Sequence, residues 1–383
     1  MLERLHIDPD TEFPLDPELV HLNHAAIGPW PARTRDAVAG FAAENAHQGS
    51  RRYLQWLETE AGLRRRLAAF IKAPSAEDIA LVKNTSEGLS LVAAGLDWQP
   101  GDRVVTSAEE FPSNRVVWQA LADRGVELVQ VELAGRDDPE AALEAVLAEG
   151  RVRLLAISSV QYASGLALDL ARLGRACREH GALFGVDAIQ SLGALAMDVE
   201  AIGADFIAAD AHKWLLAPEG IGLFYCRPEL RQRLALHQWG WHMVEHVGDF
   251  DRTDWEPAAS ARRFEPGSPN MLGIHALSAS LSVFEEVGME RVEALVRQRA
   301  REVFERAAAH PDLEPITDPE RMAGIVTFRH TGVDNAALWQ GLMDRGVLCA
   351  HRGGGIRFSP HFHTAPATIG RALEAVDAVA AGL

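Results

Sequence analysis

Polar side chains follow two short apolar runs in the middle of the chain. The run ALFGV ends on Asp187, with Gln190 three positions further on, and the run DFIAA is followed by Asp210, His212 and Lys213. A lysine amine can form a Schiff base with an aldehyde, and a carboxylate can hold a ring nitrogen protonated. Asp187 and Lys213 therefore indicate a site that holds a cofactor with an aldehyde and a ring nitrogen at two points.

An alternative places these residues on two surface loops that carry ordinary charges. However, Lys213 is followed directly by the apolar residues Trp214, Leu215 and Leu216. Lysine is almost never fully buried without a partner. The apolar surroundings therefore favour a lysine that is held inside the protein for a chemical purpose.

A second polar group lies in the segment IALVKNTSEGL, which begins at Ile79. A short apolar strand is followed by Asn84, Thr85 and Ser86, and then by an amphipathic helix. The simplest role of these three residues is to cap that helix. The free N–H groups of a helix N-terminus also attract anions, and the Thr85 and Ser86 hydroxyls would complete a phosphate site. The sequence GxxxxGK[ST] is absent, so a phosphate on a small cofactor fits this site better than ATP.

These residues need elements that bring them together, and the pattern between them alternates strands with helices. Strands are predicted at 103–108, 126–131, 153–160, 182–189, 205–210 and 220–226, and helices at roughly 113–124, 139–149 and 168–180. The strands are apolar without strict alternation, which is typical of a largely parallel sheet between two layers of helices. Ligands bind beyond the carboxyl ends of such strands. Phe111, Gln161, Asp187 and Lys213 all follow predicted strands, so we expect them at one site.

Three further residues are candidates for binding a substrate. Asn23 and His24 lie in HLNHAAIGPWP, a segment that either attaches the N-terminal arm to the body or lies beside a substrate. Arg357 follows three glycines on a short strand, where it is either a surface residue or a bidentate partner for a carboxylate. The irregular segment 230–270 carries Trp239, Trp241 and His242, which could line a pocket or fill a subunit interface. The sequence does not separate these alternatives.

The whole chain has 383 residues, which is too long for one small core. We predict an N-terminal arm at 1–30, a large domain at 31–270, and connecting helices with a small α+β domain at 271–383. The 54 acidic and 37 basic residues give a net charge of −17, so nucleic acid and anionic membranes are poor partners.

Three cysteines do not form a disulfide framework, and no apolar run reaches the length of a membrane span, so we expect a cytoplasmic protein. His361 and His363 could share a strand face, but they lack a third ligand at a fitting spacing. We therefore expect no metal site.

Together these segments resemble the class V aminotransferase family of pyridoxal-phosphate enzymes, which includes cysteine desulfurases, kynureninases and isopenicillin-N-epimerase-like proteins. The strongest match is DFIAADAHKWLLAPEGIGLFY, and VDAIQSLG and KNTSEGL are the next most specific. The resemblance covers nearly the whole chain. It implies an α/β enzyme of fold type I, with a mostly parallel central sheet and a small α+β C-terminal domain.

The resemblance also implies roles for individual residues. Lys213 would form the internal aldimine and move the substrate α-proton, while Asp187 would pair with the pyridinium nitrogen. Arg357 would bind the carboxylate of an amino acid substrate, near Asn23 and His24. Ser268 would be lent to the phosphate site of the neighbouring subunit, which implies a homodimer with shared sites. The remaining cofactor contacts would come from Thr85, Ser86 and His212 at the phosphate, Gln190 at the phenolic oxygen, Phe111 on the ring face, and Gln161 and Asp210 nearby.

The chain departs from the family pattern at two places. Desulfurase-like members often have serine where this chain has Asp210, so we expect that carboxylate to turn toward His212 or the backbone. Cysteine desulfurases carry a nucleophilic cysteine on a loop before the carboxylate arginine. Here the segment from Cys349 to Arg357 is short, and a cysteine in an apolar strand is usually a small hydrophobic residue.

We therefore expect an aminotransferase-type enzyme first, and a C–S lyase (cysteine desulfurase-like) or an amino-acid epimerase as the alternative. A non-catalytic protein of the same fold is disfavoured because the set of Lys213, Asp187, Gln190 and Arg357 is intact. A nucleotide-binding oxidoreductase is disfavoured because no GxGxxG follows a strand.

Overall fold

The computed structural model describes residues 7–383. Its largest element is a seven-stranded sheet with the order β2-β8-β7-β6-β5-β3-β4, in which only β8 runs against its neighbours. The strands, in the order of the sheet, are β2 (Ile79–Val82), β8 (Gly222–Cys226), β7 (Phe206–Asp210), β6 (Leu183–Asp187), β5 (Val152–Ser158), β3 (Arg103–Ser107) and β4 (Glu127–Val131). A mostly parallel sheet was predicted, and the structure confirms it.

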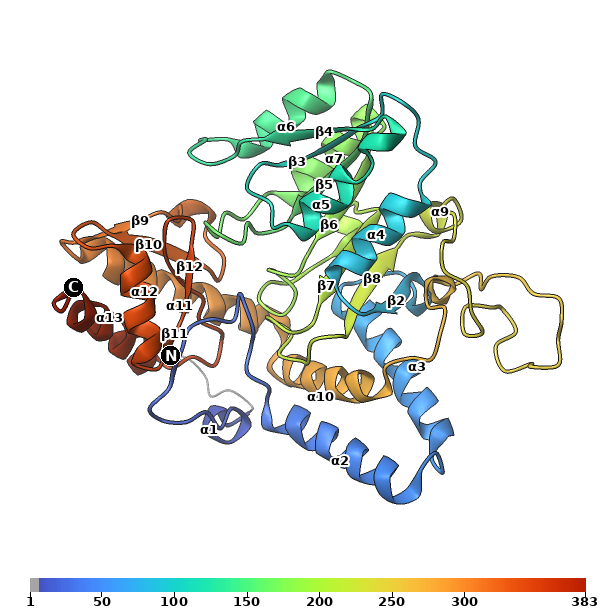
Figure 1. Cartoon of the computed structure of the whole chain (residues 1–383), viewed down its shortest axis with the longest axis horizontal. Helices are drawn as coiled ribbons and strands as arrows, with labels where there is room; N and C mark the ends of the chain where they lie inside the picture. The colour runs from blue at the N-terminus through green and yellow to red at the C-terminus, as the bar shows by residue number, and fades with distance from the viewer. Residues whose placement is uncertain (1–6) are drawn as a thin grey trace.

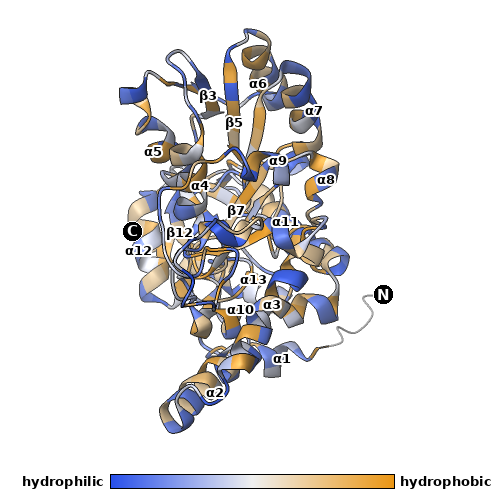
Figure 2. Cartoon of the chain, turned by 90° about the vertical axis from the view of Figure 1, so that its right-hand side faces the viewer, coloured by the Kyte–Doolittle hydropathy of each residue, from blue (hydrophilic) through white to orange (hydrophobic). Residues whose placement is uncertain are grey.

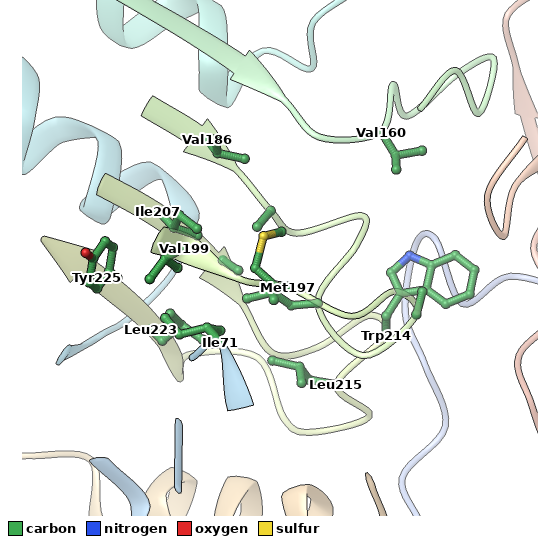
Figure 3. Close-up of a cluster of buried hydrophobic side chains, with 14 of the residues drawn as sticks. Ile71, Val160, Val186, Met197, Val199, Ile207, Trp214, Leu215, Leu223 and Tyr225 are labelled. Atoms are coloured by element: carbon green, nitrogen blue, oxygen red, sulfur yellow. The ribbon is translucent and has the colours of Figure 1, made fainter. Parts of the chain in front are cut away.

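The central strands are apolar throughout because helices cover both faces of the sheet. In β7, Ile207 and Ala209 belong to one hydrophobic cluster, while Phe206 and Ala208 belong to the other. Side chains of a strand alternate between faces, so each face receives every second residue. Figure 2 shows this hydrophobic character in β5 and β7. Figure 3 shows Val186, Ile207 and Leu223 on the adjacent strands β6, β7 and β8, with Trp214 in the same cluster.

The helices of the first cluster are α3 (Tyr53–Phe70), α6 (Pro139–Ala148), α7 (Leu170–His180), α8 (Val199–Ile202) and α10 (Met271–Val287). The second cluster receives α4 (Thr85–Gly95), α5 (Ser113–Gln119) and α9 (Pro228–Arg231). The predicted helix 113–124 is shorter than expected. It ends at Gln119, and the chain turns through Gly125, whose φ of 75° is left-handed.

A second, four-stranded sheet lies beside the large one (Figure 1). Its antiparallel strands, in the order of the sheet, are β12 (Ala350–Arg352), β13 (Gly355–Phe358), β10 (Val326–His330) and β9 (Leu313–Pro315). Its own hydrophobic cluster includes residues of α11 (Met289–Ala309), α12 (Asn335–Asp344) and α13 (Pro366–Ala380). Helix α11 contributes Val296 to the cluster of the large sheet and Val303 to that of the small sheet, so it connects the two.

The N-terminal arm was predicted to be irregular, but the structure gives it two short elements, α1 (Pro9–Glu12) and β1 (Val20–His21). Strand β1 pairs in parallel with β11 (Val347–Leu348), close to the other end of the chain. After the arm, α2 (Ala32–Gln48) packs on α10 and extends away from the body (Figure 1). Among residues 7–383, no helix combines the length and the apolar character that a bilayer span requires.

Four imidazoles hold the arm against the C-terminal part of the chain. The ring centroid of His24 lies 4.6 Å from that of His21, 5.0 Å from that of His361 and 5.1 Å from that of His363. Burial lowers the pKa of His21 to about 4 and that of His361 to about 3, and it also lowers the pKa values of His24 and His363. The four rings are therefore neutral in the folded protein at neutral pH.

This burial makes the stability of the fold depend on pH. The unfolded chain binds a proton at His21 below about pH 6.5, whereas the folded chain does so only near pH 4. Above pH 6.5, protonation of His21 therefore does not reduce the free energy of unfolding. Between pH 6.5 and pH 4 that free energy falls as the pH decreases, because only the unfolded chain binds the proton. We expect His21→Gln to flatten the decline in unfolding free energy between pH 7 and pH 5 by about 1–2 kcal/mol, measured by urea unfolding.

The control is His47→Gln, because His47 is exposed on α2 and is hydrated in both states. Its pH dependence should match that of the unaltered protein. If His21→Gln also keeps the full pH dependence, the imidazole cluster does not have this role. Buried carboxylates such as Asp187, whose pKa is raised in the fold, change the free energy of unfolding with pH in the opposite direction. Their contribution is the same in both variants and cancels when the variants are compared.

Candidate active site

A cavity of about 440 Å³ lies at the carboxyl ends of the central strands. It is bounded by the N-terminus of α4, the arm and the β12–β13 hairpin. The sequence-predicted residues that line it are Thr85, Ser86, Phe111, Asp187, Gln190, Asp210, His212, Lys213 and Arg357. The structure therefore brings together most of the residues that were selected because they follow strands or begin a helix.

Lys213 lies just beyond β7, and only 8% of its surface is exposed. Burial lowers the pKa of its amine to about 8, against the opposing attraction of Asp187, and the positive charge of Arg357 lowers the pKa further. Its Nζ lies 5.4 Å from the centroid of the Phe111 ring. A large fraction of the amine is therefore neutral near pH 8, and the neutral form is the nucleophile and the base.

Asp187 ends β6 and is 2% exposed. Its Oδ1 accepts a hydrogen bond of 3.1 Å from the Ile189 N–H, and it forms no salt bridge with any of residues 7–383. Burial raises the pKa of this carboxyl group to about 6. A buried carboxylate without a cation favours a positively charged or proton-donating ring nitrogen as its partner.

A second buried carboxylate, Glu110, lies near Asp187. It accepts hydrogen bonds from the Ser158 N–H at 2.7 Å and from the Gln161 amide at 3.0 Å. Burial raises its pKa to about 7, and the charge of Asp187 contributes in the same direction. Gln161, which we predicted as a cofactor contact, is 1% exposed and does not line the cavity. Its side-chain amide donates a hydrogen bond to Glu110 instead.

The N-terminus of α4 forms the other end of the cavity. The Asn84 side chain caps the helix by accepting a hydrogen bond of 2.9 Å from the Glu87 N–H. The Thr85 hydroxyl accepts a hydrogen bond of 3.0 Å from the Asp210 N–H, and the Ser86 hydroxyl lies 2.9 Å from that of Ser113. These hydroxyls and the free N–H groups of the helix form an anion site of the kind that binds phosphate.

Asp210 lines the cavity, and both oxygens of its carboxylate have partners. Its Oδ2 lies 3.0 Å from His212 Nδ1, and its Oδ1 accepts a hydrogen bond of 2.8 Å from the Ala211 N–H. This is the arrangement that the sequence led us to expect for a carboxylate at this position.

The arm closes the cavity with residues 25–28. The Gln190 amide donates to the Ala25 carbonyl at 3.1 Å, and the Gly28 N–H donates to the His212 carbonyl at 2.8 Å. A Cβ atom on Gly28 would lie 2.3 Å from the Lys213 carbonyl oxygen, so the close approach requires glycine. One N–H of the Gln190 amide remains for a ligand, since a primary amide has two.

Taken together, these residues fit pyridoxal phosphate. Lys213 would provide the amine for its aldehyde, Asp187 the carboxylate for its ring nitrogen, and Phe111 an aromatic face. Thr85, Ser86 and His212 surround the place where its phosphate would lie.

Two predicted substrate contacts, Asn23 and His24, are not part of this cavity. His24 is 1% exposed; its Nδ1 lies 2.9 Å from the Ser359 carbonyl oxygen, and its ring packs near Trp214. Asn23 forms a backbone bridge to Ser359. Asn23 and His24 therefore attach the arm to the body, whereas Ala25, Ala26 and Ile27 of the same segment line the cavity.

Ser268 also lies outside the cavity, beside a separate space of about 400 Å³ that Gly220 and Glu87 line. Its role at the phosphate of a neighbouring subunit stays a prediction. Trp239 and Trp241 line a cavity of about 450 Å³ within their own irregular segment and do not reach Lys213. Their alternative role at a subunit interface also stays a prediction.

Among the polar residues that line the cavity, sequence reasoning did not select Tyr162, Glu219 and Arg352. Tyr162 follows Gln161 and could have been found from its position after a strand. Arg352 could have been found from its spacing, because the short hairpin places it near Arg357.

The comparisons with known proteins agree with this geometry. The family model described as "Aminotransferase class-V" matches residues 21–360. A probable cysteine desulfurase of Methanothermobacter thermautotrophicus is 31% identical over 350 residues, which cover 89% of this chain and 86% of the relative. A cysteine desulfurase of Klebsiella pneumoniae subsp. pneumoniae is 33% identical over 326 residues, covering 81% of this chain and 77% of the relative.

Among solved structures, the apo structure of a cysteine desulfurase from Thermococcus onnurineus NA1 is similar, with a TM-score of 0.89 and 26% identity. The similarity covers 100% of this chain and 99% of that chain. The fold is thus that of fold-type-I enzymes, and the family match extends over most of the sequence. The chain belongs to the class-V aminotransferase family of pyridoxal-phosphate-dependent enzymes.

Proposed function

We propose that this protein is a C–S lyase that cleaves the Cβ–S bond of a sulfur-containing amino acid and releases the sulfur product into solution. The named relatives at 31% and 33% identity are cysteine desulfurases, whose substrate is cleaved at the same bond. They favour the C–S lyase alternative over the aminotransferase that we placed first from the sequence. The site residues support cleavage without a protein thiol.

The observation that carries this proposal is a cavity that combines Lys213 and Arg357 with no cysteine on its lining. All three cysteines are buried, and Cys349 packs in the hydrophobic cluster of the small sheet. Burial raises the pKa of the Cys349 thiol to about 12, so it is not a thiolate near neutral pH. Sulfur therefore has no nucleophile in this chain to receive it, and it leaves on the departing fragment.

Arg357 lines the cavity and has an unused hydrogen-bond donor with which it can orient the substrate. It is 2% exposed, and its Nη1 donates to the Tyr162 carbonyl at 2.7 Å. Its Nε has no hydrogen-bond partner among residues 7–383, and a buried donor without a partner is costly. The α-carboxylate of an amino acid satisfies the guanidinium, and this contact places the α-carbon toward Lys213.

When bound, pyridoxal phosphate would supply the electron sink for the α-carbon, and Asp187 would keep its ring nitrogen protonated. The neutral Lys213 amine receives the α-proton. The sulfur then leaves with the electrons of the Cβ–S bond. Overall, R–S–CH₂–CH(NH₃⁺)–COO⁻ and water give RSH, pyruvate and ammonium. Arm residues 25–27 form one wall of the cavity in which these steps take place.

Replacement of Lys213 tests the centre of this proposal. Only three lysines occur in the chain, and the other two are exposed and paired, Lys72 with Asp198 and Lys83 with Glu87. We expect Lys213→Ala to lower pyruvate release from L-cysteine and S-substituted cysteines by at least about 10²–10⁴-fold, because the chain loses its general base. The circular dichroism spectrum should not change.

Lys83→Arg is the matched control, since it changes a lysine next to the α4 N-terminus and keeps its charge. It should retain activity. Borohydride reduction of the holoenzyme should fix the cofactor on Lys213 and on neither other lysine. A protein that binds no pyridoxal phosphate, or a Lys213→Ala variant with full turnover, would show that the assignment is wrong. A keto acid formed with retention of sulfur would indicate transamination instead.

Replacement of Cys349 tests whether sulfur passes through a protein thiol. We expect Cys349→Ala to keep kcat/KM within about twofold, because the thiol is buried in the core of the small sheet. Thermal unfolding measures the cost of the smaller side chain separately. A folded Cys349→Ala protein whose turnover has fallen a hundredfold would favour the persulfide chemistry of the named relatives.

A further inference from the structure

Two arginines on one hairpin face the cavity, and neither forms a salt bridge with another residue of 7–383. In the β12–β13 ladder, Arg357 pairs with Ala350, and Arg352 lies two residues beyond Ala350 on the same strand. Side chains two residues apart point to the same face of a strand, so Arg352 and Arg357 share the face that borders the cavity. Such diagonal neighbours are separated by about 7–8 Å.

No carboxylate of residues 7–383 forms a salt bridge with Arg352, whereas Arg329, on strand β10 of the same sheet, is paired with Glu314 at 2.7 Å. Arg352 makes one hydrogen bond, from its Nη1 to the carbonyl of its neighbour His351 at 2.8 Å. A guanidinium has five N–H donors in a planar fork, so most of its capacity remains for an anion.

The other charges of the cavity do not use this capacity. Asp210 is engaged by His212, and Asp187 lies at the bottom, where it is 2% exposed. Glu219, at the rim, is exposed and forms no salt bridge with Arg352. The anion site at the α4 N-terminus is formed by other elements, and Arg357 is assigned to the α-carboxylate. Arg352 is exposed to solvent, so its remaining N–H donors are available to an anionic ligand that enters the cavity.

We propose that Arg352 binds a second anionic group at the far end of the substrate side chain. Resting on the proposed C–S cleavage, this makes the preferred substrate a cysteine whose sulfur carries a substituent that ends in a carboxylate. Arg357 then holds the α-carboxylate and Arg352 the distal one, so that the Cβ–S bond lies between two fixed ends. Arg352 determines specificity; Lys213 performs the proton transfer.

Two ligands of similar shape and different charge test this assignment. S-carboxymethyl-L-cysteine carries the distal carboxylate, and S-carbamoylmethyl-L-cysteine replaces it with a neutral amide. A hydrogen bond to a charged group contributes about 1.5–3 kcal/mol, so we expect the holoenzyme to show a KM for the acid about 10–150-fold below that for the amide. Pyruvate release measures turnover.

Arg352→Gln should remove this preference by raising the KM for the acid at least tenfold, while the KM for the amide and both kcat values change less than threefold. Arg352→Lys should restore part of the preference, because it keeps the charge and loses the fork. Arg329→Gln is the matched control: it removes one positive charge from the same sheet, outside the cavity, and should leave the preference intact.

The results also separate this inference from the proposed function. If the holoenzyme cleaves both ligands and Arg352→Gln affects them equally or not at all, the inference is wrong and the function stands. Loss of the preference in Arg329→Gln would assign it to overall charge and would also overturn the inference. If neither ligand is cleaved, calorimetry gives the Kd values: an Arg352-dependent preference for the acid then supports the inference without C–S cleavage, and its absence rejects both.

Discussion

The burial of the Lys213 amine away from water is the constraint on which the rest of the site depends. A pKa of about 8 in place of 10.5 corresponds to about 3 kcal/mol against the charged form. The same burial raises the pKa of Asp187 to about 6, so each group lies nearer neutrality than it would in water. A cofactor that bonds to the amine and presents a ring nitrogen to the carboxylate meets both needs. The Lys213 amine and the Asp187 carboxyl group are therefore preorganised for that ligand.

Segments that are far apart in the sequence enclose Asp187 and Lys213. Strands β6 and β7 bring Asp187 and Lys213 to one edge of the sheet, and the arm covers them through Ala25 and Gly28. Behind the lysine, His361 Nε2 lies 3.0 Å from the Trp214 carbonyl oxygen, and the Trp214 N–H donates to Gln190 at 2.9 Å. The low dielectric around the amine thus depends on packing of the arm, the central sheet and the C-terminal segment.

Local sequence was sufficient for the residues at strand ends and at the start of a helix. Asp187, Lys213, Thr85 and Ser86 follow apolar runs, and the geometry of parallel strands places such residues together. Local sequence left the role of His24 open, because an imidazole in a loop carries no sign of whether it faces a cavity or three other imidazoles. That distinction depends on His361 and His363, more than 330 residues away in the sequence. Arg352 was also missed. Its spacing from Arg357 is visible in the sequence, but the hairpin register and the lack of a salt-bridge partner among residues 7–383 are not.

The pairing of β1 with β11 has a consequence for how the enzyme is made. Val20 and His21 leave the ribosome early, but their partners Val347 and Leu348 are synthesised near the end of the chain. The central sheet can form before then, whereas the arm has no strand to pair with and no imidazole cluster to pack against. The wall that Ala25 and Gly28 give to the cavity is consequently a late product of folding.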